Sequence, residues 1–387
     1  MFVDTEVGDT DASGLAWSAR MALRLLTLRH SCSTGDGKGH MCAWVAALPQ
    51  QAILPHIQFS DEELHACQDN DTIREALAMR ASHQASFQVV KGQLSSMGMD
   101  QEDWDWAVAV LHSRCFTEGP AATHMVVPGV DMANHSLTPN ATVRCVHSPD
   151  ACQGQSAVED VCEAPEMQPS RFELLVGDEP IRATEEVTIS YGSWPSDVLF
   201  LFFGFVPKAN PHDAVVLFRD LLELVQFHDQ IAQPDSRARH ASLSNQRDPG
   251  PKLNGGSSGS SRAGPLPRQP AWPSAEERAE LLAESLGADC TRLVVTAEGF
   301  DGRVLAAAQG LLSLHQHLPS PIRHMTIGEF LHQRCQHLMQ QFPAPLEEDR
   351  ALLDRPDISA NTAMSIRYRM AKKRVLQAAI DAVSQGR

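Results

Sequence analysis

The spacing of apolar residues predicts that the first third of the chain is mainly helical. Between residues 15 and 28 apolar side chains recur without Gly or Pro, which is typical of a buried helix. Ser60 lies three positions before Glu63, and this pattern predicts a capping box at the start of another helix. Helical periodicity continues through Trp104 to Leu111, where the pattern changes.

The middle of the chain has the pattern of short strands. Between residues 125 and 143, and again between 172 and 189, short runs of β-branched residues alternate with turn residues. The acidic, irregular segment 145–169 between them predicts a surface loop. The helical pattern returns near Asp213, so we expect a mixed α+β region to be followed by helices.

The second half of the chain is predicted to consist of helices around one long polar insertion. Residues 233–274 hold too little apolar surface to offset the entropy of ordering, so we expect this segment to be disordered. Helices resume at Ala275. The last helix, from about Asn361, carries a basic cluster that we expect to be a solvated face, the alternative being a surface that steers an acidic partner. This cluster consists of Arg367, Arg369, Lys372, Lys373 and Arg374.

Charge and cysteine content narrow the class of partner and the compartment. Lys and Arg total 32 against 48 Asp and Glu, so the net charge of −16 predicts a protein partner and no binding to nucleic acid or anionic membranes. No apolar run reaches membrane-spanning length, and the first residues carry acids rather than a targeting signal. The nine cysteines form no C-x-x-C pair and are expected to be reduced thiols. We expect a soluble, intracellular monomer, with chloroplast, cytoplasm and nucleus left open.

A cluster of polar residues follows a predicted strand. Asp131, Asn134 and His135 bring an acid, an amide and an imidazole close together after Pro128, which is typical either of a site or of a structural turn. No second His or Cys lies at ligand spacing, and Asn is a poor ligand for transition metals. We therefore predict no metal at these residues.

Tyr191 ends a second β-like run and is followed by Gly192. Such a tyrosine can be a core residue whose hydroxyl has a partner, and this interpretation stays open. The run of aromatic residues at 200–205 predicts a water-poor wall beside whatever Tyr191 contacts, and part of that run is expected to be core.

Four short motifs occur in the order seen in one enzyme family. They are residues 113–116, 127–136, 189–192 and 203–207. Together they make the chain resemble SET-type protein methyltransferases of the Rubisco large-subunit methyltransferase (LSMT) class. The resemblance implies an α+β SET fold, made of small β-sheets with a pseudoknot and a helical insert, followed by an all-α C-terminal domain.

The same resemblance implies two domains. Residues 1–207 correspond to the SET domain, with its helical insert at about 14–112. Residues 208–387 correspond to a helical LSMT-type substrate-binding domain, interrupted at about 233–274. Family members begin with a strand and a Gly-rich turn that contact the cofactor, and this chain is expected to lack those N-terminal strands.

The resemblance further implies S-adenosylmethionine as the cofactor. Tyr191 would be the catalytic residue, at the channel where the acceptor nitrogen meets the methyl group. The cofactor-binding residues would be Arg114, Asn134, His135 and Phe205, and the substrate-binding residues Asp131 and Phe203. Lysine is the expected acceptor on a protein substrate, with histidine as the alternative.

Two other functions stay open from the sequence. Because the N-terminal cofactor-binding segment is expected to be missing, the chain would alternatively be a catalytically inactive SET-fold protein-binding module. The third hypothesis is a helical scaffold whose motif matches are coincidental.

Overall fold

The computed structural model describes residues 2–3, 14–35, 39–118, 123–147, 169–232, 273–287, 290–316 and 325–385. These residues form two compact units, Met1–His212 with Leu346–Ala371 and Asp213–Pro345 with Lys372–Arg387. Residues 346–371, which the sequence analysis placed in the C-terminal domain, group with the first unit. The boundary at residue 207 stays a prediction. Nearly all of the insertion predicted at 233–274 and most of the loop predicted at 145–169 lie outside the described residues.

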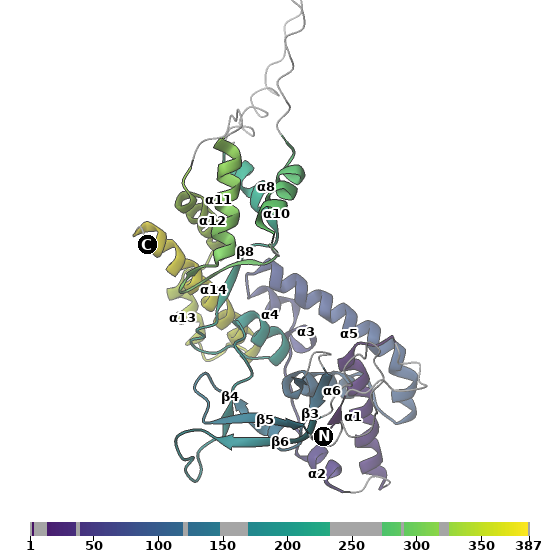
Figure 1. Ribbon diagram of the computed structural model, residues 1–387. Helices are drawn as coiled ribbons and strands as arrows, with labels where there is room; N and C mark the ends of the chain where they lie inside the picture. The colour runs from purple at the N-terminus through teal and green to yellow at the C-terminus, as the bar shows by residue number, and fades with distance from the viewer. Residues whose placement is uncertain are drawn as a thin grey trace, which may run out of the picture. The chain divides into compact units, whose positions relative to one another are not determined.

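Helices make up most of the first unit. They are α1 (Trp17–Thr34), α2 (His40–Ala47), α3 (Pro55–Gln58), α4 (Asp61–His65), α5 (Asn70–Ser96), α6 (Gln101–Arg114), α13 (Leu346–Leu353) and the start of α14 (Ala360–Ser384). The capping box predicted at Ser60 is confirmed, because Ser60 Oγ accepts the Glu63 backbone N–H and the Glu63 carboxylate accepts that of Ser60. α1 packs on α6 (Figure 1). Met21 and Leu25 of α1 and Trp104 of α6 are fully buried.

Three short strands form an antiparallel sheet in this unit. Their order is β1 (Phe2–Val3), β3 (Thr123–Val126) and β2 (Phe116–Glu118). β1 precedes the first helix, where no strand was identified from the sequence. Backbone pairing of only two residues was too short to leave a recognisable period-two pattern. That the chain lacks the family's cofactor-contacting N-terminal strands stays a prediction.

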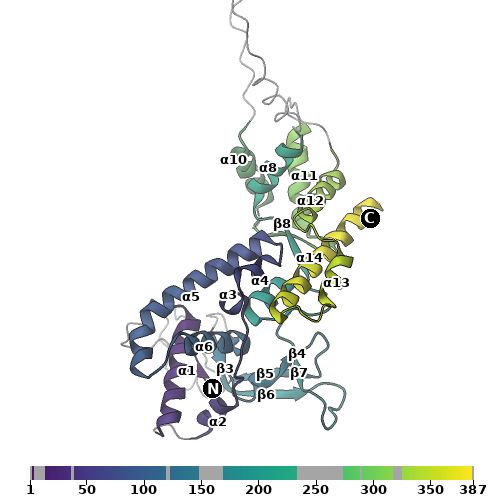
Figure 2. The ribbon, with the colours of Figure 1, turned by 180° about the vertical axis from the view of Figure 1, so that it is seen from behind.

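Two further strand pairs bring distant segments together. β5 (Ala141–His147) pairs antiparallel with β6 (Pro169–Val176), and β4 (Asn134–His135) pairs in parallel with β7 (Thr188–Ile189). β4 and β7 lie beside the β5–β6 pair (Figure 2). Asn140 links the chain before β5 to the chain at β7. Its Oδ1 accepts the Thr188 N–H at 2.8 Å, and its Nδ2 donates to the Glu186 carbonyl at 2.8 Å.

A turn rich in aromatic residues follows β7. α7 (Ser196–Val198) continues into the π-helical turn η3 (Leu199–Phe203), in which Leu199 and Phe200 are buried core residues, as part of this run was predicted to be. Gly204 ends the turn with a φ of +73°, and a Cβ there would lie 1.8 Å from the Ile53 carbonyl oxygen. Only glycine fits this close approach, and it sets the course of the chain between Phe203 and Phe205.

The second unit combines helices with a small sheet. The sheet has the antiparallel order β10 (Gly299–Phe300), β9 (Leu293–Thr296), β8 (Ala214–Phe218). The helices are α8 (Leu221–Ala232), α10 (Ala275–Leu286), α11 (Gly302–Gln316), α12 (Ile327–Met339) and the end of α14. The mixed fold with a helical C-terminal region is confirmed, but the expected all-α C-terminal domain contains this additional sheet.

The basic cluster of α14 is largely buried, so the predicted solvated face is wrong for three of its five residues. Arg369, Lys372 and Lys373 are 4%, 5% and 2% exposed. Each has partners: the Arg369 guanidinium donates to Asp349, the Lys372 ammonium to the Ala214 carbonyl, and the Lys373 ammonium to the Ala344 carbonyl. Long basic side chains can reach backbone oxygens that a helical pattern does not reveal.

Cysteine chemistry also differs from the prediction. Cys32 and Cys42 form a disulfide that joins the end of α1 to the start of α2, whereas all nine cysteines were expected to be reduced. Within the described ranges, no helix is long and apolar enough to cross a membrane, and no three His, Cys, Asp or Glu side chains are arranged to hold a metal ion.

Candidate active site

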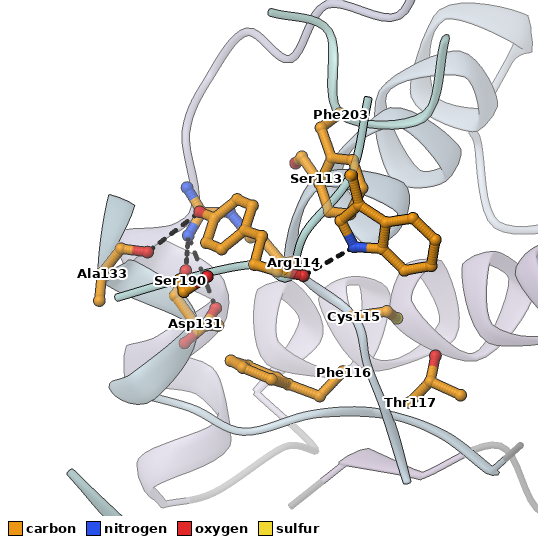
Figure 3. Close-up of a pocket in the computed structure, with 11 residues that line it drawn as sticks. Ser113, Arg114, Cys115, Phe116, Thr117, Asp131, Ala133, Ser190 and Phe203 are labelled. Atoms are coloured by element: carbon orange, nitrogen blue, oxygen red, sulfur yellow. Dashed lines mark hydrogen bonds and ion pairs between the residues drawn. The ribbon is translucent and has the colours of Figure 1, made fainter. Parts of the chain in front are cut away.

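A cavity of about 220 Å³ opens beside the paired strands β4 and β7 in the first unit (Figure 3). Its wall comes from the end of α6, from β2, from η1 (Val130–Met132), from the segment after β7 and from the last residue of η3. The lining residues are Ser113, Arg114, Cys115, Phe116, Thr117, Asp131, Ala133, Ser190, Tyr191, Trp194 and Phe203.

Hydrogen bonds hold Tyr191 at its backbone N–H and at its hydroxyl. Its backbone N–H donates to His135 Nδ1 at 3.1 Å, and its hydroxyl donates to the Ala133 carbonyl at 3.0 Å. The Trp194 indole donates to the Tyr191 carbonyl at 2.7 Å. Burial is the main cause that raises the pKa of Tyr191, so the phenol stays protonated at neutral pH.

Four aromatic rings gather around the cavity and the paired strands. The ring centroid of Tyr191 lies 5.3 Å from those of His135 and Phe203 and 6.3 Å from that of Phe205. The Phe205 ring also lies 5.7 Å from His135. Of these rings, Tyr191 and Phe203 line the cavity, and aromatic faces can attract a cationic group.

Arg114 and Asp131 form the polar floor of the cavity (Figure 3). Arg114 Nη1 donates to the Asp131 backbone carbonyl at 2.6 Å and lies 3.7 Å from its carboxylate. The Asp131 carboxylate is fully buried and accepts the Trp44 indole N–H at 3.0 Å and the Gly129 backbone N–H at 2.8 Å. Asp131 therefore orients its neighbours and presents little of its own charge to a ligand.

Two buried nitrogens close to this site have no hydrogen-bond partner among the described residues: Arg114 Nε and His135 Nε2. Because His135 Nδ1 accepts the Tyr191 N–H, a neutral imidazole must carry its proton on Nε2. Burial, followed by the nearby His212, lowers the pKa of His135 and favours that neutral form. Both nitrogens are thus donors without an acceptor, which suits a ligand that carries a carboxylate or ring nitrogens.

The predicted site residues are only partly brought together by the cavity. Tyr191, Arg114, Asp131 and Phe203 line it. His135 and Phe205 contact Tyr191 from outside the lining. Asn134 is exposed and donates to the Glu186 carboxylate at 2.6 Å. The roles assigned to these residues stay predictions.

Several lining residues were not predicted as site residues. Ser113, Cys115 and Phe116 belong to a motif that was quoted for the resemblance, but only its arginine was given a role. Trp194 was missed altogether. The only signal in the sequence is its position three residues after Tyr191, and the structure adds the hydrogen bond from its indole to the Tyr191 carbonyl.

Comparisons with known proteins agree on the class of fold. Residues 269–376 match the family model described as Rubisco LSMT substrate-binding. A segment of 106 residues is 35% identical to SET domain-containing protein 8 of Schizosaccharomyces pombe and covers 27% of this chain. The match spans 19%, about a fifth, of that relative's length.

Solved structures extend the likeness over nearly the whole chain. The SET domain of LSMT bound to lysine and AdoHcy has a TM-score of 0.56 at 17% identity, and the match covers 97% of this chain and 76% of that one. Rubisco LSMT bound to sinefungin and monomethyllysine gives 0.55 at 16% identity and covers 100% and 79%. Rubisco LSMT bound to AdoMet gives 0.52 at 17% identity, with 100% and 80% covered. This protein therefore has the SET fold. The predicted resemblance to the Rubisco LSMT class is confirmed in its fold and in its C-terminal region.

Proposed function

We propose that this protein transfers a methyl group from S-adenosylmethionine to a lysine side chain of a protein substrate. The observation that carries the proposal is the cavity in which the Tyr191 hydroxyl and aromatic walls lie beside Arg114, whose buried Nε has no acceptor among the described residues. The solved relatives of this fold contain AdoMet, AdoHcy, lysine or monomethyllysine, which supports the same pair of ligands here.

The cavity suits a displacement that needs alignment and a neutral amine. S-adenosylmethionine supplies an electrophilic methyl group and needs no metal. Arg114 Nε and His135 Nε2 offer donors for the polar parts of this cofactor. The apolar walls formed by Phe203 and Tyr191 disfavour a charged lysine and so favour the deprotonated nucleophile.

Tyr191 is the group that we expect to align the acceptor. Because its hydroxyl hydrogen is directed to the Ala133 carbonyl, the lone pairs of its oxygen are free to accept an N–H from an incoming amine. This contact would hold the amine nitrogen in line with the transferred methyl group. The match of residues 269–376 supports the proposal that this segment binds the protein substrate.

Labelling of a cell extract with S-adenosylmethionine that carries an isotopic methyl group tests the proposal. We expect a discrete labelled protein, and a loss of roughly tenfold or more in the rate with Tyr191→Phe. Tyr368→Phe is the matched control, because it removes the only other phenol of the chain, which bonds to Thr72 and Asp69 in the core. Equal labelling by both variants would exclude Tyr191 from the mechanism.

The alternative function, an inactive SET-fold binding module, makes a different prediction for the same protein. If calorimetry shows no binding of S-adenosylhomocysteine and the extract stays unlabelled, the binding module is favoured. Labelling at a histidine rather than a lysine, read by mass spectrometry of the product, would change the acceptor and keep the site.

A further inference from the structure

Trp44 is connected to the candidate active site although it lies in the helical insert. Its indole N–H donates to Asp131 Oδ2 at 3.0 Å in a fully buried contact. The other carboxylate oxygen accepts the Gly129 N–H at 2.8 Å, and the backbone carbonyl of Asp131 accepts Arg114 Nη1 at 2.6 Å. Trp44 therefore fixes the orientation of the residue that in turn fixes Arg114.

The helix that carries Trp44 is short and has no side-chain N-cap. α2 has eight residues, and Trp44 is its one buried residue. Its N-cap is Gly39, with a φ of +98° and no side-chain capping bond. Helices of this length are not stable in isolation, so α2 depends on tertiary support.

The Cys32–Cys42 disulfide supplies such support. Cys32 lies in the last turn of α1, whose Met21, Leu25 and Leu26 are fully buried, and Cys42 lies in the first turn of α2. The cross-link thus ties a short helix, which also packs Met41 and Val45 against the core, to a helix with several fully buried residues. Cys42 lies two residues before Trp44 in the sequence.

We propose that Trp44 is a positioning residue for Arg114, and that the Cys32–Cys42 disulfide holds it there, so that reduction of this disulfide weakens ligand binding at the candidate active site. This inference rests on the proposed function for the identity of the ligand. The contacts from Cys42 through Trp44 and Asp131 to Arg114 do not depend on it.

The chemical step is a thiol–disulfide exchange with a dithiol reductant. The dithiol supplies two electrons and two protons, the Sγ–Sγ bond breaks, and Cys32 and Cys42 become thiols. The reductant becomes a disulfide, so electrons and atoms balance. In the reduced protein α2 loses its side-chain cross-link to α1, and only the peptide chain and noncovalent contacts hold α2 in place.

The contacts from Trp44 through Asp131 to Gly129 and Arg114 form a relay. Hydrogen exchange of the ligand-free protein tests this relay independently of any ligand. Trp44→Phe removes the indole N–H, so the Asp131 carboxylate is less firmly held, and we expect the Gly129 amide to exchange about tenfold faster. Trp106→Phe is the matched control, because it removes an indole bond of similar length, 2.8 Å to the Pro49 carbonyl, from the same insert without touching Asp131. Unchanged exchange at Gly129 in Trp44→Phe, or an equal change in Trp106→Phe, would overturn the relay.

Calorimetry with S-adenosylhomocysteine tests the link to the site. We expect the Kd to rise about tenfold in Trp44→Phe and about threefold when the wild-type protein is reduced with dithiothreitol. A Cys32→Ser, Cys42→Ser variant should bind like the reduced wild type and should not respond to dithiothreitol. A response that persists in this variant, or a wild-type Kd that reduction leaves unchanged, would overturn the role of the disulfide. If the oxidised wild type binds no S-adenosylhomocysteine, the proposed function fails, and the exchange at Gly129 alone decides the relay.

Discussion

Arg369 and Arg114 are both arginines of the first unit with little exposed surface, but their guanidinium groups differ in how many partners they have. Arg369 donates to Asp349 through Nε and Nη2, at 3.0 and 2.7 Å, and to the Ala66 carbonyl through Nη1 at 2.7 Å. Arg114 donates through Nη1 to Asp131, while its buried Nε has no acceptor in the described part of the chain. A buried guanidinium whose three nitrogens all donate serves folding, whereas one with a nitrogen that lacks an acceptor suits a ligand.

Removing the partner of Arg369 should have the largest effect on stability. Asp349→Ala leaves a buried guanidinium without its counter-charge, so we expect a loss of about 4 kcal/mol in the free energy of unfolding, measured from urea titrations followed by tryptophan fluorescence. Asp357→Ala breaks the exposed pair with Arg355 and should leave the free energy of unfolding nearly unchanged, because solvent screens this pair. Equal losses in the two variants would contradict the structural role of the buried pair.

Acid should reveal a second group of buried polar residues. Burial, followed by neighbouring histidines, lowers the pKa of His56 from 6.5 to about 3 and that of His112 to about 4. Below pH 6.5 the unfolded chain binds protons on these rings while the folded protein does not, so stability is full above pH 6.5 and decreases as the pH falls towards 4 and 3. We expect about 1.4 kcal/mol per pH unit from each ring, or up to about 3 kcal/mol between pH 6 and 5. Urea midpoints at pH 5, 6 and 7 measure this change.

A single variant gives the control for the acid effect. His56→Gln removes one of the two rings and should reduce the slope of stability against pH by about half. If the slope of the wild-type protein is flat in this window, the rings are not held neutral by burial.

Arg114→Gln should affect ligand binding more than folding. It removes the unpartnered donor and the charge beside the cavity. We therefore expect the binding free energy of S-adenosylhomocysteine to weaken by about 2 kcal/mol, which raises its Kd roughly thirtyfold. The expected loss of stability is about 1 kcal/mol, because Asp131 keeps its bonds from Trp44 and Gly129. Arg114→Lys keeps the charge but not the planar donors and should fall between the two. If Arg114→Gln unfolds as readily as Asp349→Ala but binds S-adenosylhomocysteine normally, Arg114 serves folding rather than ligand binding.

The sequence predicted which residues lie together better than it predicted their contacts. The motifs placed Tyr191, Arg114, Asp131 and Phe203 in one site because their order resembles a known family, and the structure brings these four to one cavity. Apolar periodicity by itself would not have joined them, since they lie on four separate segments. Binding of S-adenosylmethionine, the monomeric state, the lack of nucleic-acid binding and the compartment stay predictions.

The errors arise where tertiary contacts override local pattern. A helical wheel places Lys372 and Lys373 with other basic residues on a polar face, but their ammonium groups reach backbone carbonyls in the interior. The Cys32–Cys42 bond joins residues on two helices, and no spacing rule anticipates that pair. The two-residue strands β1, β4 and β7 are likewise too short for any periodicity to show.

The pairing of β4 with β7 also determines when in folding the cavity forms. Two residue pairs close a loop of about fifty residues, and the entropy of that closure is lost before the new contacts compensate for it. We therefore expect the helices before residue 115 to form early and the walls around Tyr191 to form last. An intermediate that contains only those helices has no cavity, and a ligand of the site would stabilise only the final step of folding in this unit.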